Sequence, residues 1–180
     1  MLKYIRKYKS VLWFVLTFLG TYLLLSAAYN QYLKLETSAE YYPDYITHQV
    51  AVQSEWFINQ LGYTASIEPH EEEPSMKLII NDQFLARVVE GCNAVSVIIL
   101  FCAFVLAFFD GWKKSLVFLM VGTLAIYIIN VIRIGLLAIA IYEFPEYSDF
   151  LHTIVFPLVI YGFVFLLWIY WIHQFSIKRK

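Results

Sequence analysis

Residues 115–142, SLVFLMVGTLAIYIINVIRIGLLAIAIY, form a long apolar run that decides the fold class. Lipid offers the backbone no hydrogen-bond partners, so a chain crosses roughly 30 Å of hydrocarbon as a helix of about 20 apolar residues. This run is longer than that, and we expect its helix to tilt or to lift its last turns clear of the lipid. The whole chain has the same character, because 61% of its 180 residues are apolar and 19% are aromatic.

Three further apolar runs predict additional spans, which makes four transmembrane helices in the lipid bilayer. They cover residues 11–28, 94–109 and 153–173. The run 94–109 is short for a span. The first run also fits a secretory signal, because basic residues precede it and Ser26, Ala27 and Ala28 have the small side chains of a cleavage site. Its length and its Trp13 favour a membrane helix instead.

The charged residues are sorted along the chain, although the net charge is only -1. Basic residues cluster before the first run, between the second and third runs, and at the C-terminus. Acidic residues fall almost entirely within 29–91 and 143–149. By the positive-inside rule, both termini are then cytoplasmic and the two acidic segments lie outside. The acidic outer segment and the scattered basic residues argue against nucleic-acid binding.

Residues 29–91 predict one extracytoplasmic insertion. Within it, residues 43–61 have the apolar spacing of an amphipathic helix, and Gly62 is a stop signal. Residues 76–80 and 84–89 flank a turn-like Asn-Asp pair, which predicts a β-hairpin that delivers the chain to the second span. The apolar positions that define the helix are Ile46, Val50, Phe57 and Leu61.

The predicted fold class is an all-α polytopic membrane protein with a small extracytoplasmic α/β insertion between helices 1 and 2. Residues 1–28 hold the cytoplasmic N-terminus and the first span, 29–91 the insertion, and 92–180 the other three spans with the candidate site. We find no Gly-rich phosphate loop and no metal-type Cys/His spacing. No cofactor and no metal are therefore expected.

The two cysteines, Cys92 and Cys102, have different surroundings. On one helix they are about 15 Å apart, too far for a disulfide. Cys102 lies in the middle of a span, where a cysteine is usually a small inert hydrophobe. Cys92 falls at or just before the first turn, with Asn93 as a plausible N-cap. A helix N-terminus stabilises a thiolate and so activates a nucleophile, although Glu90 opposes ionisation.

Two further polar residues interrupt the apolar spans. Arg133 lies about 27 Å from the start of the run 115–142, near the outer face, where a buried cation normally faces a polar cavity or a partner. Asn130, one turn earlier on the same face, is placed to hydrogen-bond Arg133. His152 opens the fourth span from the outside. The alternative to a functional role is that the arginine side chain snorkels toward the membrane surface and that the histidine is simply solvated.

Topology brings Cys92, Arg133 and His152 from three different spans to the outer half of the membrane. A nucleophile, a general base and a fixed cation are the groups that acyl transfer through a thioester requires. The alternative is a non-catalytic membrane scaffold in which Arg133 locks helices together. A thiol oxidoreductase is disfavoured, because the single outer cysteine has no resolving partner.

These residues resemble the exosortase and archaeosortase family of membrane-embedded cysteine transpeptidases, and most of all its short Bacteroidetes branch, exosortase F. The matching motifs are EGCNAVSV (90–97), NVIRIGLL (130–137) and LHTIVFP (151–157), and the resemblance covers about residues 76–165. The chain departs from the family in two ways. Relatives commonly have Cys-Ser-Gly where this chain has Cys92-Asn93-Ala94, and many have around twice as many spans.

The resemblance implies a cysteine peptidase or transpeptidase on the periplasmic face of a bacterial inner membrane. Its substrate would be a secreted protein with a C-terminal sorting tail, made of a short motif, a membrane helix and a basic end. By the family pattern Cys92 is the nucleophile, with Arg133 and His152 as its partners; water, a lipid or an envelope amine would accept the acyl group. A tail-binding assembly factor that does not cut is the other possibility.

Overall fold

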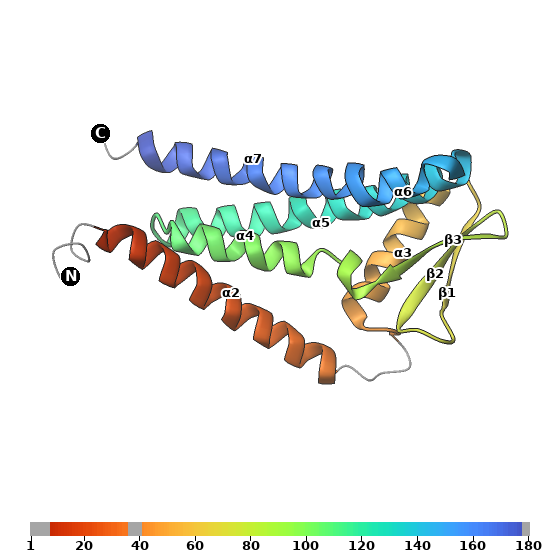
Figure 1. Ribbon diagram of the computed structural model, residues 1–180, viewed down its shortest axis with the longest axis horizontal. Coiled ribbons are helices and arrows are strands. Elements are labelled where there is room, and N and C mark those ends of the chain that lie inside the picture. The colour runs from red at the N-terminus through yellow and green to blue at the C-terminus, as the bar shows by residue number, and fades with distance from the viewer. Residues whose placement is uncertain (1–7, 36–40, 178–180) are drawn as a thin grey trace.

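The computed structural model describes residues 8–35 and 41–177. Long helices run along the molecule's long axis, and a small sheet with a crossing helix covers one end (Figure 1). The long helices are α2 (Lys9–Leu35), α4 (Val95–Ala107), α5 (Trp112–Glu143) and α7 (Phe156–Ile177). The start of α2, the α4–α5 turn and the end of α7 lie together at the end opposite the sheet (Figure 1).

Three helical segments are long and apolar enough to cross a membrane, within the described residues. They are Lys9–Leu35, Trp112–Glu143 and Pro145–Gln174. The predicted second span instead forms the 13-residue helix α4, which is shorter than the roughly 20 residues that a crossing needs. It begins after Ala94, whose φ is +65°, and ends at Ala107 with Phe108 as its C-cap. Four spans were predicted, and three helical segments of the described residues have the length of a full span.

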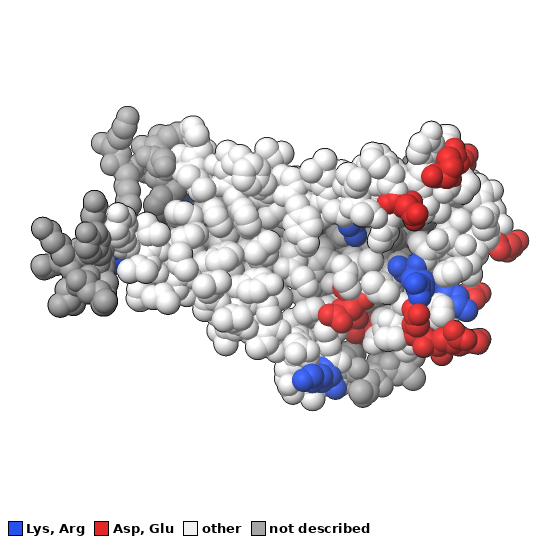
Figure 2. Space-filling model, viewed as in Figure 1, with Lys and Arg blue, Asp and Glu red and all other residues white. Residues whose placement is uncertain are grey.

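Helix α4 nevertheless belongs to the helical bundle, because it packs against α2, α5 and α7. Its Phe101 is fully buried and lies directly over Gly122 of α5, where any side chain would collide with the ring. The close approach of the two helices therefore depends on that glycine. Figure 2 shows that charged side chains gather at the sheet end, while the visible face along the helices is almost free of them.

Helix α3 (Tyr45–Gln60) matches the predicted amphipathic helix, and Gly62, with φ +91°, follows its end as expected. Asp44 caps its start by accepting hydrogen bonds from the backbone of Ile46 and Thr47. The buried face differs from the prediction, because Leu61 is exposed and smaller side chains face inward. The buried residues are Thr47, Val50, Ala51, Ser54 and Ile58.

Small side chains on this face let α3 cross close to α5. A Cβ atom at Gly135 of α5 would lie 2.5 Å from the Phe57 ring of α3, so only glycine permits the contact. Residues Ile134 and Ala138 flank Gly135 in a core shared with Val50. The C-terminal part of α5 is therefore covered by the insertion rather than exposed.

The predicted hairpin forms from β2 (Ser75–Ile80) and β3 (Gln83–Val89). Its turn residues Asn81 and Asp82 both have positive φ, as a type I′ turn requires. The structure adds β1 (Ala65–Pro69), which the sequence analysis missed, and the antiparallel order is β1-β2-β3. Alternate residues of β2 are buried against the α3–α5 core, so the sheet is fixed over the end of α5.

The predicted outer loop 143–149 consists mostly of short helical turns. These are η2 (Pro145–Tyr147) and α6 (Ser148–Phe150). The π-helical turn η3 (Leu151–Val155) follows them and continues into α7. Wide turns of this kind occur frequently at functional sites. Here the π turn carries His152.

Candidate active site

A cavity of about 670 Å³ lies where β3, the C-terminal part of α5 and η3 meet. Cys92, Arg133 and His152 all line it, each from a different element. From their places in three different spans, the three residues were expected to share the outer half of the membrane. The structure brings them into one cavity at the sheet end of the molecule.

Cys92 is the last residue of the 3-10 turn η1 (Glu90–Cys92), which joins β3 to α4. Its side chain is half-buried, and its backbone carbonyl accepts a 2.6 Å hydrogen bond from the Asn130 amide of α5. Asn130 was expected to be placed to hydrogen-bond Arg133, whereas the hydrogen bond that its amide donates goes to the Cys92 carbonyl. The buried amide fixes the backbone of the cysteine instead.

Asn93 has a different role from the predicted N-cap. The N-cap position of α4 is Ala94, one residue after Asn93. The Asn93 side chain accepts a hydrogen bond from the backbone N–H of Val95, the first residue of the helix. The Asn93 amide donates to Tyr29 of α2 at 2.7 Å and to Thr47 of α3 at 3.0 Å. With an exposed fraction of only 1%, Asn93 ties the residue after the cysteine to two other helices.

Arg133 is half-buried and points part of its guanidinium into the protein. Its Nε is buried and has no hydrogen-bond partner among the described residues. Arg133 lines the same cavity as Cys92. An arginine held in this way supplies an unused donor and a positive charge for an anion that forms beside the sulfur.

His152 is exposed and reaches the same cavity from η3. Within residues 8–35 and 41–177, no hydrogen bond joins its ring to Cys92. Catalytic hydrogen bonds are often long before substrate binds, so cavity sharing without contact is compatible with proton transfer. The imidazole therefore has access to the sulfur's surroundings but is not locked onto it.

A family model described as transmembrane exosortase (Exosortase_EpsH) matches residues 5–170, which is most of the chain and includes all three residues. The chain belongs to the transmembrane exosortase family. No curated protein and no solved structure matches it. The resemblance drawn from the sequence is confirmed at the level of this family, and the apolar helices agree with an exosortase in a membrane.

The backbone explains one departure of this exosortase from its relatives. Ala94 occupies the position where the family commonly has glycine, and its φ of +65° lies in the left-handed region that glycine prefers. The alanine keeps that backbone conformation at a cost of roughly 1–2 kcal/mol. The turn after Cys92 therefore has a backbone conformation that glycine prefers, although the residue is alanine.

Three charged residues at the cavity were not predicted as site residues. Arg87 of β3 forms an ion pair with Glu73, and Asp149 of α6 contributes from the opposite wall. The predicted hairpin placed Arg87 shortly before Cys92, and this closeness in sequence could have identified Arg87 as a site residue. Glu73 belongs to an acidic run that predicts only a solvated turn, and its position depends on tertiary pairing.

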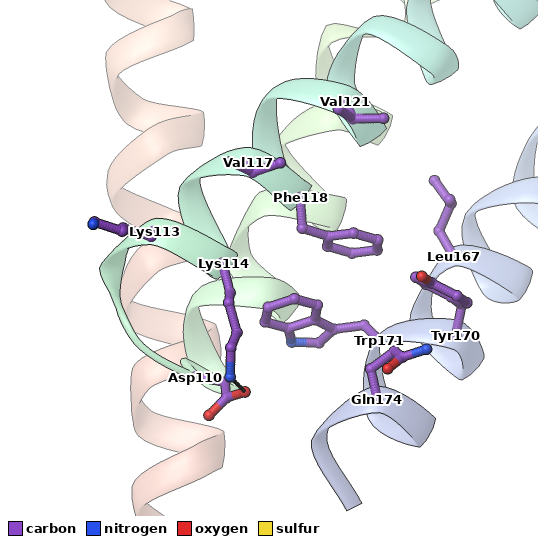
Figure 3. A pocket seen from close by; sticks show the side chains of 10 residues that line it. All are labelled: Asp110, Lys113, Lys114, Val117, Phe118, Val121, Leu167, Tyr170, Trp171 and Gln174. Atoms are coloured by element: carbon purple, nitrogen blue, oxygen red, sulfur yellow. Dashed lines mark hydrogen bonds and ion pairs between the residues drawn. The ribbon is translucent and has the colours of Figure 1, made fainter. Parts of the chain in front are cut away.

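A second cavity of about 620 Å³ lies at the opposite end, between α5 and α7 (Figure 3). Trp171 stacks on Phe118 along its wall, with ring centroids 4.6 Å apart, and Lys114 pairs with Asp110 at its rim. No cysteine or histidine is among the residues that line it. Cys92 and His152 thus line the first cavity and not the second.

Cys102 behaves as the sequence predicts for a structural cysteine. It is half-buried beside the α4–α5 core, and its Sγ lies 3.9 Å from the Thr123 hydroxyl. Both cysteines are free thiols. Among residues 8–35 and 41–177 there is no group of three or more His, Cys, Asp or Glu side chains placed to hold a metal ion.

Proposed function

We propose that this exosortase is a cysteine peptidase or transpeptidase that processes C-terminal sorting tails of secreted proteins, and that it belongs to the exosortase F branch. The observation that carries the proposal is the shared cavity of Cys92, Arg133 and His152. Family membership supports it, because exosortases are membrane-embedded sorting transpeptidases.

In the proposed reaction, His152 removes the proton from the Cys92 thiol, and the sulfur attacks the carbonyl carbon of the scissile peptide bond. Arg133 stabilises the oxyanion of the tetrahedral intermediate. Collapse of the intermediate breaks the C–N bond, and the leaving amine takes the proton from His152. A thioester remains on Cys92. Water, a lipid or an envelope amine then attacks that thioester and restores the thiol.

We propose that the cavity faces the periplasm and that both termini are cytoplasmic in a bacterial inner membrane. Lys113 and Lys114 lie at the end opposite the acidic sheet end, as the positive-inside rule requires. Asn130 lies about 27 Å along α5 from Trp112, and it binds the Cys92 backbone, so the sulfur sits near the outer edge of roughly 30 Å of hydrocarbon.

In this arrangement α4, about 20 Å long and with its outer end at Cys92, is an additional shorter crossing that brings the number to four. Helix α5 continues for about 20 Å beyond Asn130 to Glu143, which lifts its last turns out of the lipid and under the insertion. The scissile bond of a tail would then be cut where its own membrane helix leaves the bilayer.

The absence of a hydrogen bond between His152 and Cys92 in the described part of the chain favours one second candidate. In it, the same cavity binds tails without cutting them, as an assembly factor. Binding without cleavage by the native protein would select this candidate.

The test uses a reporter that carries a sorting tail from a protein encoded in the same genome, expressed with the full-length exosortase. We expect cleavage to disappear with Cys92→Ala and to persist with the matched control Cys102→Ala. His152→Ala is expected to lose cleavage, whereas the control His173→Ala keeps it. Cleavage at the native rate by Cys92→Ala would overturn the proposal.

A further inference from the structure

Strand β3 is an edge strand with one free edge, and its pairing with β2 is irregular at Leu85, between the pairs Leu78–Ala86 and Ile79–Phe84. The sheet order β1-β2-β3 leaves β3 paired only with β2, and no other strand among residues 8–35 and 41–177 covers its second edge. Natural proteins normally protect such edges against pairing with other chains. This edge bears a single charged residue, Arg87, and the side chains of Phe84 and Val89 are exposed.

The register identifies which main-chain groups face the open edge. The backbone of Ser75 turns toward β1, because its carbonyl accepts a hydrogen bond from His70 N. Antiparallel ladders alternate, so Lys77 and Ile79 also turn toward β1. Across the β2–β3 ladder these three residues of β2 lie opposite Val89, Arg87 and Phe84 of β3. The N–H and C=O groups of Phe84, Arg87 and Val89 therefore point away from β2, toward the free edge.

The open edge is also a wall of the candidate active site. Residues 84–89 line the 670 Å³ cavity together with Cys92. The chain passes from Val89 through the short turn η1 directly to Cys92. A peptide that followed β3 would therefore run into the sulfur. The edge from Phe84 to Val89 is about 17 Å long, which accommodates roughly five or six extended residues.

We infer that the substrate segment next to the scissile bond binds as an added antiparallel or parallel strand on the free edge of β3, which delivers its carbonyl to Cys92. The inference rests on the proposed function. Main-chain hydrogen bonds from Arg87 and Val89 supply the affinity, as in other β-augmentation complexes. The π turn that carries His152 forms the opposite wall of the slot.

The charges of the slot indicate an uncharged segment. Arg87 and Arg133 are balanced by Glu73 and Asp149, so the slot has no net preference for an acidic or a basic peptide. Arg87 and Glu73 already satisfy each other in an ion pair. Selection by charge is therefore weak, and the extended main chain is the recognised feature.

The first experiment measures peptide binding without cleavage, using full-length Cys92→Ala protein in lipid nanodiscs. The probes are synthetic peptides of the segment that precedes the membrane helix of a cleaved reporter, each N-methylated at one successive position. We expect affinity to fall at every second position, because only alternate N–H groups of an added strand face β3. Equal tolerance of methylation at all positions would overturn the inference.

The second experiment tests the protein's own edge. Arg87→Pro removes the outward N–H that is not needed by β2, and Arg87→Ala is the matched control, since both lose the ion pair to Glu73. We expect Arg87→Pro to lower kcat/KM for the reporter about five- to tenfold below Arg87→Ala, as the loss of one main-chain hydrogen bond predicts. Equal kcat/KM for the two variants would contradict strand addition.

Two outcomes separate this inference from its rivals. If the N-methyl series and the proline variant have no effect while Cys92→Ala still abolishes cleavage, strand addition fails and the proposed function stands. If the native protein is a dimer that Arg87→Pro converts to a monomer, the edge is occupied by a second copy, and the inference is overturned.

Discussion

Asn93 offers the sharpest test of how the Cys92 segment is held. Its side chain makes three hydrogen bonds, to Tyr29, to Thr47 and from Val95 N, and its exposed fraction is 1%. Asn93→Ala removes all three. At roughly 0.5–1.5 kcal/mol for each bond, we expect the free energy of unfolding to fall by roughly 1.5–4.5 kcal/mol. The upper part of the range applies because the Thr47 hydroxyl stays buried without its donor.

The assay is unfolding of the full-length protein in mixed micelles, titrated with a denaturing detergent and followed by tryptophan fluorescence. Thr47→Val is the matched control, because it deletes one of the three bonds and keeps the side-chain shape. It should cost about 1 kcal/mol. The double variant Asn93→Ala/Thr47→Val should cost less than the sum of the two single variants, because they remove the same bond.

The reasoning is refuted if Asn93→Ala destabilises the protein no more than Thr47→Val does. That result would mean that the contacts to Tyr29 and Val95 contribute nothing, and that α2 is not tied to the cysteine segment through this amide. Additive effects in the double variant would also contradict the direct Asn93–Thr47 bond.

Three more predictions follow from single contacts. Ala94→Gly should raise the free energy of unfolding in the same titration by roughly 1 kcal/mol, because it relieves the left-handed alanine, and destabilisation would contradict this. Gly135→Leu should push α3 off α5 and speed tryptic cleavage of the insertion, whereas adding Phe57→Ala should slow it again; no change in either variant would argue against the close contact. The hydrogen bond from Tyr63 to Glu143 raises the pKa of Tyr63 above its ordinary value of 10.0. The stabilisation of the folded protein by this bond is therefore present below pH 10.0 and is lost as the pH rises through the higher pKa of the folded state. Tyr63→Phe should remove this pH dependence from unfolding titrations.

Much of the helical architecture follows from the sequence because lipid imposes a simple rule. An apolar run without backbone partners must form a helix, and the runs 11–28, 115–142 and 153–173 all do so. The run 94–109 also becomes a helix, but only residues 95–107 are helical, between Ala94 with positive φ and the C-cap Phe108. Apolarity predicts a helix's existence better than its length.

The details of the site were harder to predict, since they depend on residues distant in sequence. Asn93 pairs with Tyr29 and Thr47, which are brought beside it only by the docking of α2 and α3. Strand β1 was missed because its short stretch is mostly exposed and ends at a proline, so it lacks the apolar alternation of β2. Motif order and sidedness were enough to predict the shared location of Cys92, Arg133 and His152, but not what holds them.

Detection of a thioester on Cys92 is the decisive test of the proposed catalysis. Full-length protein is mixed with a tail peptide, quenched in acid within the first turnovers, and analysed by intact mass and peptide mapping. We expect a mass increase equal to the N-terminal fragment of the peptide less one water, located on Cys92 and released by hydroxylamine. Turnover of the tail peptide with no adduct on Cys92 at any quench time would contradict the account.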